Sequence, residues 1–157
     1  MLQKFGVTKD TKLVRTPLGA HIKLSSQQCP KTDEEKIQMN GIPYANLVGG
    51  LMYAMVCTRP DIAHAIRIVS RFMHNLGREH WNATKWILRH LHGTRDKGIC
   101  FERCDEGIDK FSVGYMDLDF AGDLDKRIST TGYVFTMTNG PICWRSILQP
   151  TMALATT

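Results

Sequence analysis

Apolar residues recur at helical spacing from residue 44 onward. They stand at i, i+3, i+4, i+7, i+8 and i+11, as Tyr44, Leu47, Val48, Leu51, Met52 and Met55. This spacing places one apolar stripe along a helix. Pro43 suits the first turn, because its missing N–H is not needed there. Gly49 and Gly50 cost about 1 kcal/mol each relative to Ala, and we expect them to admit a neighbouring backbone at close range.

Two further helices are predicted after short turns. The segment Thr58-Arg-Pro-Asp61 has the N-cap, first-turn proline and first-turn acid of a helix start. The apolar stripe that follows it consists of Ile62, Ile66, Val69, Phe72 and Met73. The third helix is expected from about Glu79 to His92, with Gly93 as its C-terminal stop. Three helices joined by short turns predict a compact helical subdomain over residues 44–97.

Residues 1–43 show only weak periodicity. Pro, Ser and Thr interrupt this part of the chain, as in Thr16-Pro-Leu-Gly19 and Ser25-Ser-Gln-Gln-Cys-Pro30. Clusters of such residues are typical of loops. We expect an extended connecting segment that packs on another part of the protein or stays mobile, and that does not fold alone.

Beyond Gly98 the period falls to two, which is typical of strands. The strands are expected at Ile99–Cys104, Phe111–Met116, Thr131–Thr138 and Ile142–Leu148. The pair Asn139-Gly140 is a hairpin turn signal, so the last two strands should run antiparallel. The stretch Met152–Thr157 is compatible with the start of a helix. The sequence therefore predicts an α+β fold, with helices first and an antiparallel sheet after them.

The net charge of +5 is unevenly distributed along the chain. Residues 1–43 carry a net +3 and residues 59–97 a net +5, whereas residues 98–157 carry a net −3. A basic middle followed by an acidic part suits a bound polyanion next to a bound metal, although solvated helix faces give the same count. The five cysteines are odd in number and irregularly spaced, which favours reduced thiols. No apolar run approaches the roughly 20 residues of a membrane span, and no signal core is visible, so we expect an intracellular protein without a membrane partner.

Four carboxylates crowd into nine residues at the end of one predicted strand. They are Asp117, Asp119, Asp123 and Asp125. A calcium loop is excluded, because Ala121 and Ile128 stand where such a loop needs ligands. The alternative is a Mg²⁺ site anchored by Asp117 on the strand. For the other three aspartates the simpler interpretation is a solvated turn whose carboxylates cap local backbone N–H groups.

Two predicted helices each carry a ridge of cations. Arg67 and Arg71 lie four residues apart on the second helix, and Lys85, Arg89 and His92 follow helical spacing on the third. Adjacent cationic ridges can straddle the phosphate backbone of a nucleic acid, with affinity that falls steeply with salt. An ordinary solvated surface is the competing interpretation. No glycine-rich phosphate loop, nucleophile elbow or Cys/His nucleophile pair is present.

Three long motifs carry a resemblance to a known family. They are Pro43-Tyr-Ala-Asn-Leu-Val-Gly-Gly-Leu-Met-Tyr-Ala-Met-Val-Cys-Thr-Arg-Pro-Asp-Ile-Ala63, Glu79-His-Trp-Asn-Ala-Thr-Lys-Trp-Ile-Leu-Arg-His-Leu-His-Gly-Thr94 and Gly114-Tyr-Met-Asp-Leu-Asp-Phe-Ala-Gly-Asp123. Together they resemble the Pol polyproteins of copia-type LTR retrotransposons. The resemblance implies that residues 44–97 form the helical, thumb-like C-terminal region of a reverse transcriptase. It also implies that residues 98–157 form the first, incomplete part of a ribonuclease H-like domain.

The resemblance assigns a role to Asp117. It matches the first of several carboxylates that hold two Mg²⁺ ions on the RNA strand of an RNA–DNA hybrid in the family's ribonuclease H. The next carboxylate follows an Ala-Leu-x-Thr-Thr pattern, which here is Ala153-Leu-Ala-Thr-Thr157, where the sequence stops. The polymerase's own Tyr-Val-Asp-Asp-like motif is expected before residue 1. Asp117 would then be a vestigial member of an incomplete set.

The resulting expectation is a Pol fragment that is inactive alone and holds no Mg²⁺ stably, although the intact parent uses it. Catalytic groups that act as a unit lose most of the rate when one is missing. The expected partners are an RNA–DNA hybrid or another nucleic acid, bound through Arg67, Arg71, Lys85 and Arg89, and the rest of the Pol polyprotein. The alternatives are a non-catalytic nucleic-acid-binding module and a protein-interaction module, since an unfinished sheet exposes edges and apolar surface.

Overall fold

The computed structural model describes residues 2–102 and 112–151. Four α-helices precede a three-stranded antiparallel sheet with the strand order β1-β2-β3. The helices are α1 (Asp33–Met39), α2 (Tyr44–Cys57), α3 (Ala63–Val69) and α4 (Arg78–Gly93). The strands are β1 (Ser112–Asp119), β2 (Thr130–Met137) and β3 (Gly140–Leu148). The predicted α+β fold is confirmed.

The hydrophobic core lies between α2, α3 and α4. Its fully buried side chains include Leu47, Leu51, Ile62 and Ile66 from the two predicted stripes, together with Ile87 and Leu88 of α4. Burying such a side chain contributes about 1.5–3 kcal/mol. The Tyr44 hydroxyl is also buried, and it donates a hydrogen bond to the Val69 carbonyl at 2.8 Å. That bond ties the start of α2 to the end of α3.

The predicted second helix has three parts. Short 3-10 turns at Pro60–Ile62 and Ser70–Phe72 flank α3. The expectation that Gly49 on α2 admits a neighbouring backbone is wrong, because an added Cβ there would meet nothing within 4 Å. The glycine therefore does not mark a close backbone approach.

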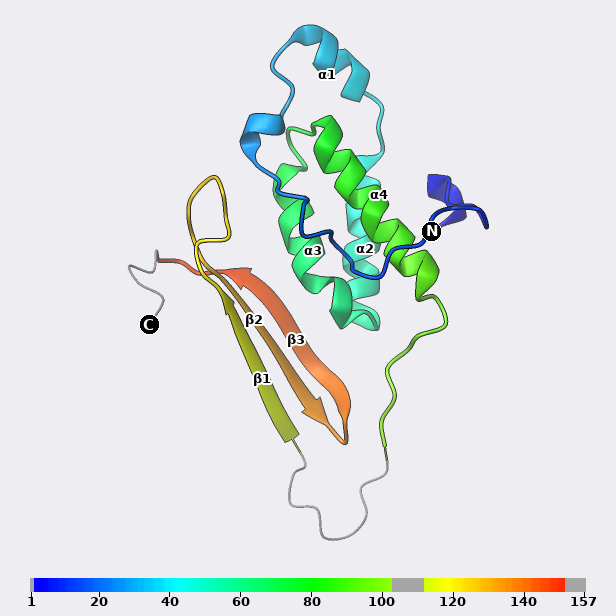
Figure 1. Cartoon of the computed structure of the whole chain (residues 1–157), viewed down its shortest axis with the longest axis vertical. Helices are drawn as coiled ribbons and strands as arrows, with labels where there is room; N and C mark the ends of the chain where they lie inside the picture. The colour runs from blue at the N-terminus through cyan, green and yellow to red at the C-terminus, as the bar shows by residue number, and fades with distance from the viewer. Residues whose placement is uncertain (1, 103–111, 152–157) are drawn as a thin grey trace.

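The N-terminal segment is more structured than its sequence predicts. The structure contains α1, which begins at an N-cap where Thr32 accepts a hydrogen bond from the Glu35 N–H. The Glu35 carboxylate accepts in return from the Thr32 N–H, and this reciprocal pair is a capping box. The helix buries no residue, so no apolar stripe was present to predict it. The rest of the segment crosses α4 as a chain whose only helical parts are two short 3-10 turns, Gln3–Phe5 and Ser26–Gln28, within the described residues (Figure 1).

The sheet follows the predicted hairpin with a shift of one residue. The two-residue turn is Thr138-Asn139, with φ of 48° and 62°, whereas the sequence predicts Asn139-Gly140. Two positive φ angles are typical of a type I′ turn, whose twist matches that of the strands. Gly140 instead begins β3, where a Cβ would overlap the Phe101 ring.

The predicted strand at Ile99–Cys104 is wrong over its described part, Ile99–Glu102. These residues lie in neither helix nor strand. One backbone hydrogen bond, from the Glu102 N–H to the Thr138 carbonyl at 2.9 Å, holds them against the hairpin turn. A strand requires a continuing ladder of such bonds. Residues 103–111 and the predicted helix at 152–157 lie outside the described residues.

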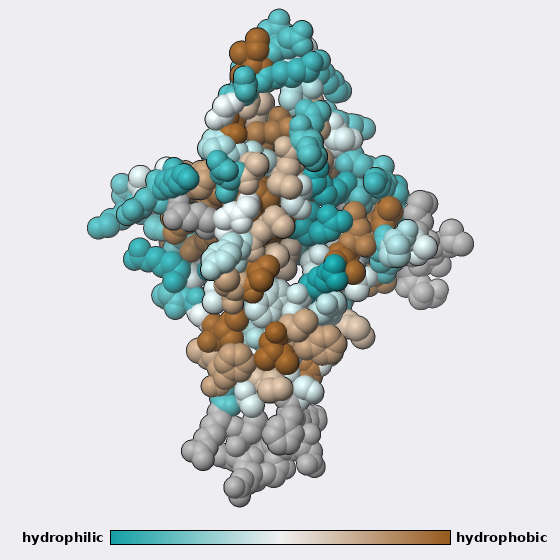
Figure 2. All heavy atoms as spheres, turned by 180° about the vertical axis from the view of Figure 1, so that it is seen from behind, coloured by the Kyte–Doolittle hydropathy of each residue, from teal (hydrophilic) through white to brown (hydrophobic). Residues whose placement is uncertain are grey.

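One face of the sheet turns toward α3, and β3 is the strand in contact with it (Figure 1). The Trp144 indole N–H of β3 donates to the Met55 carbonyl of α2 at 3.1 Å. The opposite face leaves apolar side chains in solvent, among them Met116, 82% exposed, and Leu118, 50% exposed. Hydrophobic side chains also gather in the lower part of the view in Figure 2.

Candidate functional site

Asp117 lies on β1 and opens onto a cleft between the sheet and the start of α3. The cleft has a volume of about 590 Å³, and its polar lining includes Asp61, His64, Asp117 and Asp119. The Asp117 side chain is exposed, and its Oδ1 accepts the N–H of its neighbour Leu118 at 2.9 Å. The strand therefore presents this carboxylate to solvent.

The carboxylates around Asp117 do not make a complete metal site within the described residues. Asp119 is two residues further along the same strand, so the two Cα atoms are separated by about 7 Å. Across residues 2–102 and 112–151, no three Cys, His, Asp or Glu side chains lie close enough to share a metal ion. Mg²⁺ requires near-octahedral oxygen coordination at short distance. The described side chains do not fit such an ion.

The acidic loop after β1 is bound to the helices. Arg71 reaches the Asp123 Oδ1 at 2.7 Å and the Asp125 Oδ2 at 3.0 Å. Asp125 also accepts hydrogen bonds from the N–H and the hydroxyl of Ser26. The prediction of a solvated turn is wrong for Asp123, whose side chain is only 1% exposed. The predicted capping role is confirmed, because Asp123 Oδ1 accepts the N–H groups of Asp125 and Lys126.

These contacts determine the ionisation of Asp123. Burial alone would raise the pKa of its carboxyl group. The two backbone donors and the Arg71 guanidinium outweigh burial, so the pKa lies below its ordinary value. For Arg67, burial and then the neighbouring charge of Arg71 lower the pKa of the guanidinium. Arg67 and Arg71 therefore face the protein's own acidic loop.

A second ion-pair network lies between α3 and α4. Asp61 accepts from the Arg59 Nη2 at 2.6 Å and from the Arg59 Nε at 2.9 Å. The His90 Nε2 lies 2.7 Å from the Asp61 Oδ2, and the Thr94 hydroxyl donates to the His90 carbonyl. Burial would raise the pKa of Asp61, but hydrogen bonds from Arg59 and His90 lower it overall. This network fixes the start of α3 against the end of α4.

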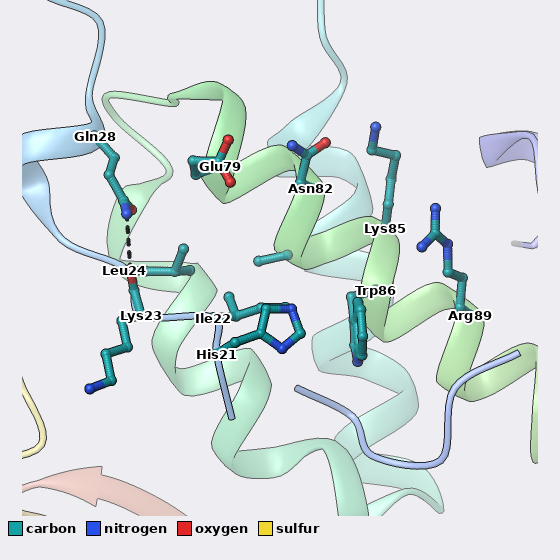
Figure 3. A pocket seen from close by; sticks show the side chains of 11 residues that line it. His21, Ile22, Lys23, Leu24, Gln28, Glu79, Asn82, Lys85, Trp86 and Arg89 are labelled. Atoms are coloured by element: carbon teal, nitrogen blue, oxygen red, sulfur yellow. Dashed lines mark hydrogen bonds between the residues drawn. The ribbon is translucent and has the colours of Figure 1, made fainter. Parts of the chain in front are cut away.

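The cations of α4 lie apart from both networks. Lys85 and Arg89 line a cleft of about 270 Å³ between α4 and the segment that crosses it. Figure 3 shows Glu79, Asn82, Trp86 and the two cations projecting from α4, opposite His21 and Lys23. The His21 and Trp86 rings meet edge to face, with centroids 5.2 Å apart. The structure thus separates Lys85 and Arg89 from Arg67 and Arg71.

His21, Lys23, Asn82 and Trp86 are among the lining residues of this cleft that sequence reasoning missed. His21 and Lys23 belong to a segment without periodicity, so nothing local indicated their position beside α4. Asn82 and Trp86 were detectable in principle, because they lie one helical turn or less from the predicted cations. Helical spacing brings residues i, i+3 and i+4 onto one face.

In the described part of the chain, no helix combines the length and apolar character that a bilayer crossing requires.

Several proteins resemble this chain in sequence. The retrovirus-related Pol polyprotein from transposon TNT 1-94 of Nicotiana tabacum is 54% identical over 157 residues. The match covers the whole of this chain and 11% of the length of that polyprotein. A segment of 138 residues, 88% of the chain, is 36% identical to 9% of the Pol polyprotein from transposon RE2 of Arabidopsis thaliana. The chain thus spans about a tenth of these Pol polyproteins.

A shorter protein matches over most of its own length. The secreted RxLR effector protein 161 of Plasmopara viticola is 44% identical over 119 residues, which are 76% of this chain and 82% of the effector. No family model and no solved structure matches the chain. The chain belongs to one sequence family with that effector, and it is homologous to the retrovirus-related Pol polyproteins of transposons.

Proposed function

We propose that the chain corresponds to the junction of reverse transcriptase and ribonuclease H in a copia-type Pol polyprotein. Residues 44–97 would be the thumb-like end of the polymerase, residues 98–157 the start of the nuclease, and residues 1–43 the connection that precedes them. The parent protein would copy RNA into DNA and degrade the RNA of the hybrid. The observation that carries the proposal is Asp117, exposed in an antiparallel sheet that follows a three-helix core. Similarity to Pol polyproteins over the full chain supports it.

We expect this chain to cleave no RNA–DNA hybrid by itself. Among the described residues, Asp117 has no set of further ligating side chains around it. Asp123 and Asp125 are both ion-paired with Arg71, so they are engaged within the protein. Any use of Mg²⁺ by the parent would need carboxylates beyond those described here.

The test is incubation of the purified chain with a labelled RNA–DNA hybrid and Mg²⁺, with an active ribonuclease H as positive control. We expect no cleavage above background. The matched variants are Asp117→Asn and Asp119→Asn, which make the same change two residues apart on β1. Cleavage that is lost in Asp117→Asn and kept in Asp119→Asn would contradict the expectation.

A second candidate function is nucleic-acid binding without chemistry. It is favoured by Lys85 and Arg89, because within the described residues no hydrogen bond or ion pair engages either side chain. Arg71, in contrast, is held by two carboxylates. Binding should weaken steeply as salt rises, since each phosphate contact releases counterions. Binding to a labelled oligonucleotide that is undetectable or independent of salt would exclude this function.

A further inference from the structure

The cleft beneath the N-terminal segment has an excess of positive charge. Its charged lining consists of Lys23, Lys85 and Arg89 against one carboxylate, Glu79. Lys23 comes from the crossing segment, whereas the other three lie along α4 (Figure 3). The Lys23 side chain points away from the α4 cations, whereas Lys85 and Arg89 project side by side, and neighbouring cations favour an anionic ligand (Figure 3).

Lys85 and Arg89 differ in their contacts from Arg59 and Arg71 of the helical subdomain. Arg59 and Arg71 are each held by carboxylates at 2.6–3.0 Å. Within the residues that the structure describes, Lys85, Arg89 and Asn82 make no side-chain hydrogen bond or ion pair, and Lys85 only approaches the Trp81 ring at 5.8 Å. Their hydrogen-bond donors are available to a ligand. Phosphate oxygens are acceptors that suit both lysine and arginine.

An aromatic pair forms another part of the lining. The Trp86 indole N–H donates to the Thr16 carbonyl at 3.0 Å, which fixes the orientation of the ring. His21 packs edge to face against it at 5.2 Å and is itself exposed. A fixed aromatic surface next to cations is the combination with which proteins hold an unpaired base and its phosphate.

The size of the cleft limits what can enter it. At about 270 Å³ it lies near the lower end of small-molecule sites, roughly 300 Å³. One nucleotide fits such a volume, whereas the stacked pairs of a duplex do not.

We propose that this cleft is a subsite for one nucleotide of a single-stranded nucleic acid. Lys85 and Arg89 bind its phosphate, and the base lies against Trp86 and His21. The proposal rests on the nucleic-acid-binding function above and adds to it the place and the strand state of the ligand.

The test is fluorescence anisotropy of a labelled single-stranded oligonucleotide with the full chain, compared with a blunt duplex of the same sequence. We expect the single strand to bind about tenfold more tightly at equal salt. Lys85→Ala combined with Arg89→Ala should weaken single-strand binding by about tenfold or more and should lower its salt dependence. His21→Ala should weaken single-strand binding by about threefold. Because His21 is exposed, we expect this variant to fold as the wild type does.

The charge-matched control is Lys9→Ala combined with Lys12→Ala. Both lysines are exposed and lie outside the cleft, so their removal should change binding by less than about twofold. Circular dichroism of each variant verifies that the helices are intact. A cleft variant that folds and binds as tightly as the wild type would overturn the proposal, as would a preference for the duplex.

Competition separates the possible sources of the phosphate. A nucleoside monophosphate should displace the oligonucleotide at much lower concentration than inorganic phosphate does. Equal displacement by the two would refute recognition of the base. Salt-dependent binding that is unaffected by the cleft variants would leave nucleic-acid binding in place while excluding this subsite, and hybrid cleavage is scored independently of both.

Discussion

The Arg71 guanidinium lies 2.7 Å from the Asp123 carboxylate, across 52 residues of sequence. Arg71 follows α3, and Asp123 lies in the loop that follows β1, so this pair joins the helices to the sheet. The Asp123 side chain is 1% exposed and that of Arg71 is 18% exposed. Buried charges are costly without a partner, so each residue depends on the other.

We predict that Arg71→Met destabilises the protein by about 3 kcal/mol, because it leaves a buried carboxylate without its cation. Methionine keeps most of the aliphatic volume, so the loss reports mainly on the ion pair. Urea unfolding followed by circular dichroism measures the change in the free energy of unfolding.

The control is Lys36→Met, which breaks the exposed pair between Lys36 and Asp33 on α1. Exposed pairs contribute little, so we expect a loss below about 0.5 kcal/mol. Equal losses in the free energy of unfolding would contradict a larger contribution of the buried Arg71 pair than of the exposed Lys36 pair.

His80 should make stability depend on pH. Its Nδ1 accepts the Gly77 N–H at 2.9 Å, so the neutral ring carries its proton on Nε2, 3.2 Å from the Ser25 carbonyl. Burial lowers the pKa of His80 below its ordinary value of 6.5. The unfolded chain therefore binds a proton before the folded one does. Stability is full above about pH 6.5 and falls as the pH drops toward the folded pKa.

We predict that the loss of stability between about pH 7.5 and 5.5 is smaller in His80→Gln than in the wild type. The pKa values of Asp61 and Asp123 are lowered from 3.8, so these groups stay ionised in this range. The matched control is His74→Gln, at an exposed position, which should leave the pH dependence unchanged. Unfolding curves at the two pH values decide between these outcomes.

Local patterns predicted the helices of the core, α2 to α4, and the hairpin, but not α1. Each apolar stripe, such as that of Leu47 and Leu51, is a property of neighbouring residues and is buried wherever the helix packs. The turn at Asn139 was misplaced by one residue, because the fit of Gly140 against Phe101 depends on residues far away in the sequence.

Charge was harder to predict than hydrophobicity. Spacing predicts Arg67 and Arg71 on one side of one helix, whereas the structure has Arg67 on α3 and Arg71 in the 3-10 turn that follows it. Spacing also does not say what that side faces. Here it faces Asp123, 52 residues further along the chain from Arg71. The cleft of Lys85 likewise depends on Lys23, which lies on a segment with no local signal.

Trp144 should contribute to the docking of the sheet on the helices. Its indole N–H donates to the Met55 carbonyl of α2 at 3.1 Å. We predict that Trp144→Phe costs about 1–2 kcal/mol, since it keeps an aromatic ring and removes this donor. The control is Trp81→Phe, because the Trp81 indole makes no hydrogen bond within the described residues. Hydrogen exchange should show faster opening of β3 in Trp144→Phe alone, and unchanged exchange would contradict the role of this bond.

Two glycines should respond in opposite directions to the same substitution. Gly77 precedes α4, and a Cβ there would overlap the Gln28 carbonyl of the crossing segment. Backbone cannot move aside as a flexible side chain can, so we predict that Gly77→Ala destabilises the protein by about 1–3 kcal/mol. Gly49 lies inside α2 with open space around it, so Gly49→Ala should stabilise by about 0.5–1 kcal/mol through helix propensity. Thermal unfolding of both variants measures the two signs. A neutral Gly77→Ala would mean that the segment carrying His21 and Lys23 is not held against α4, and the cleft would lose one of its walls.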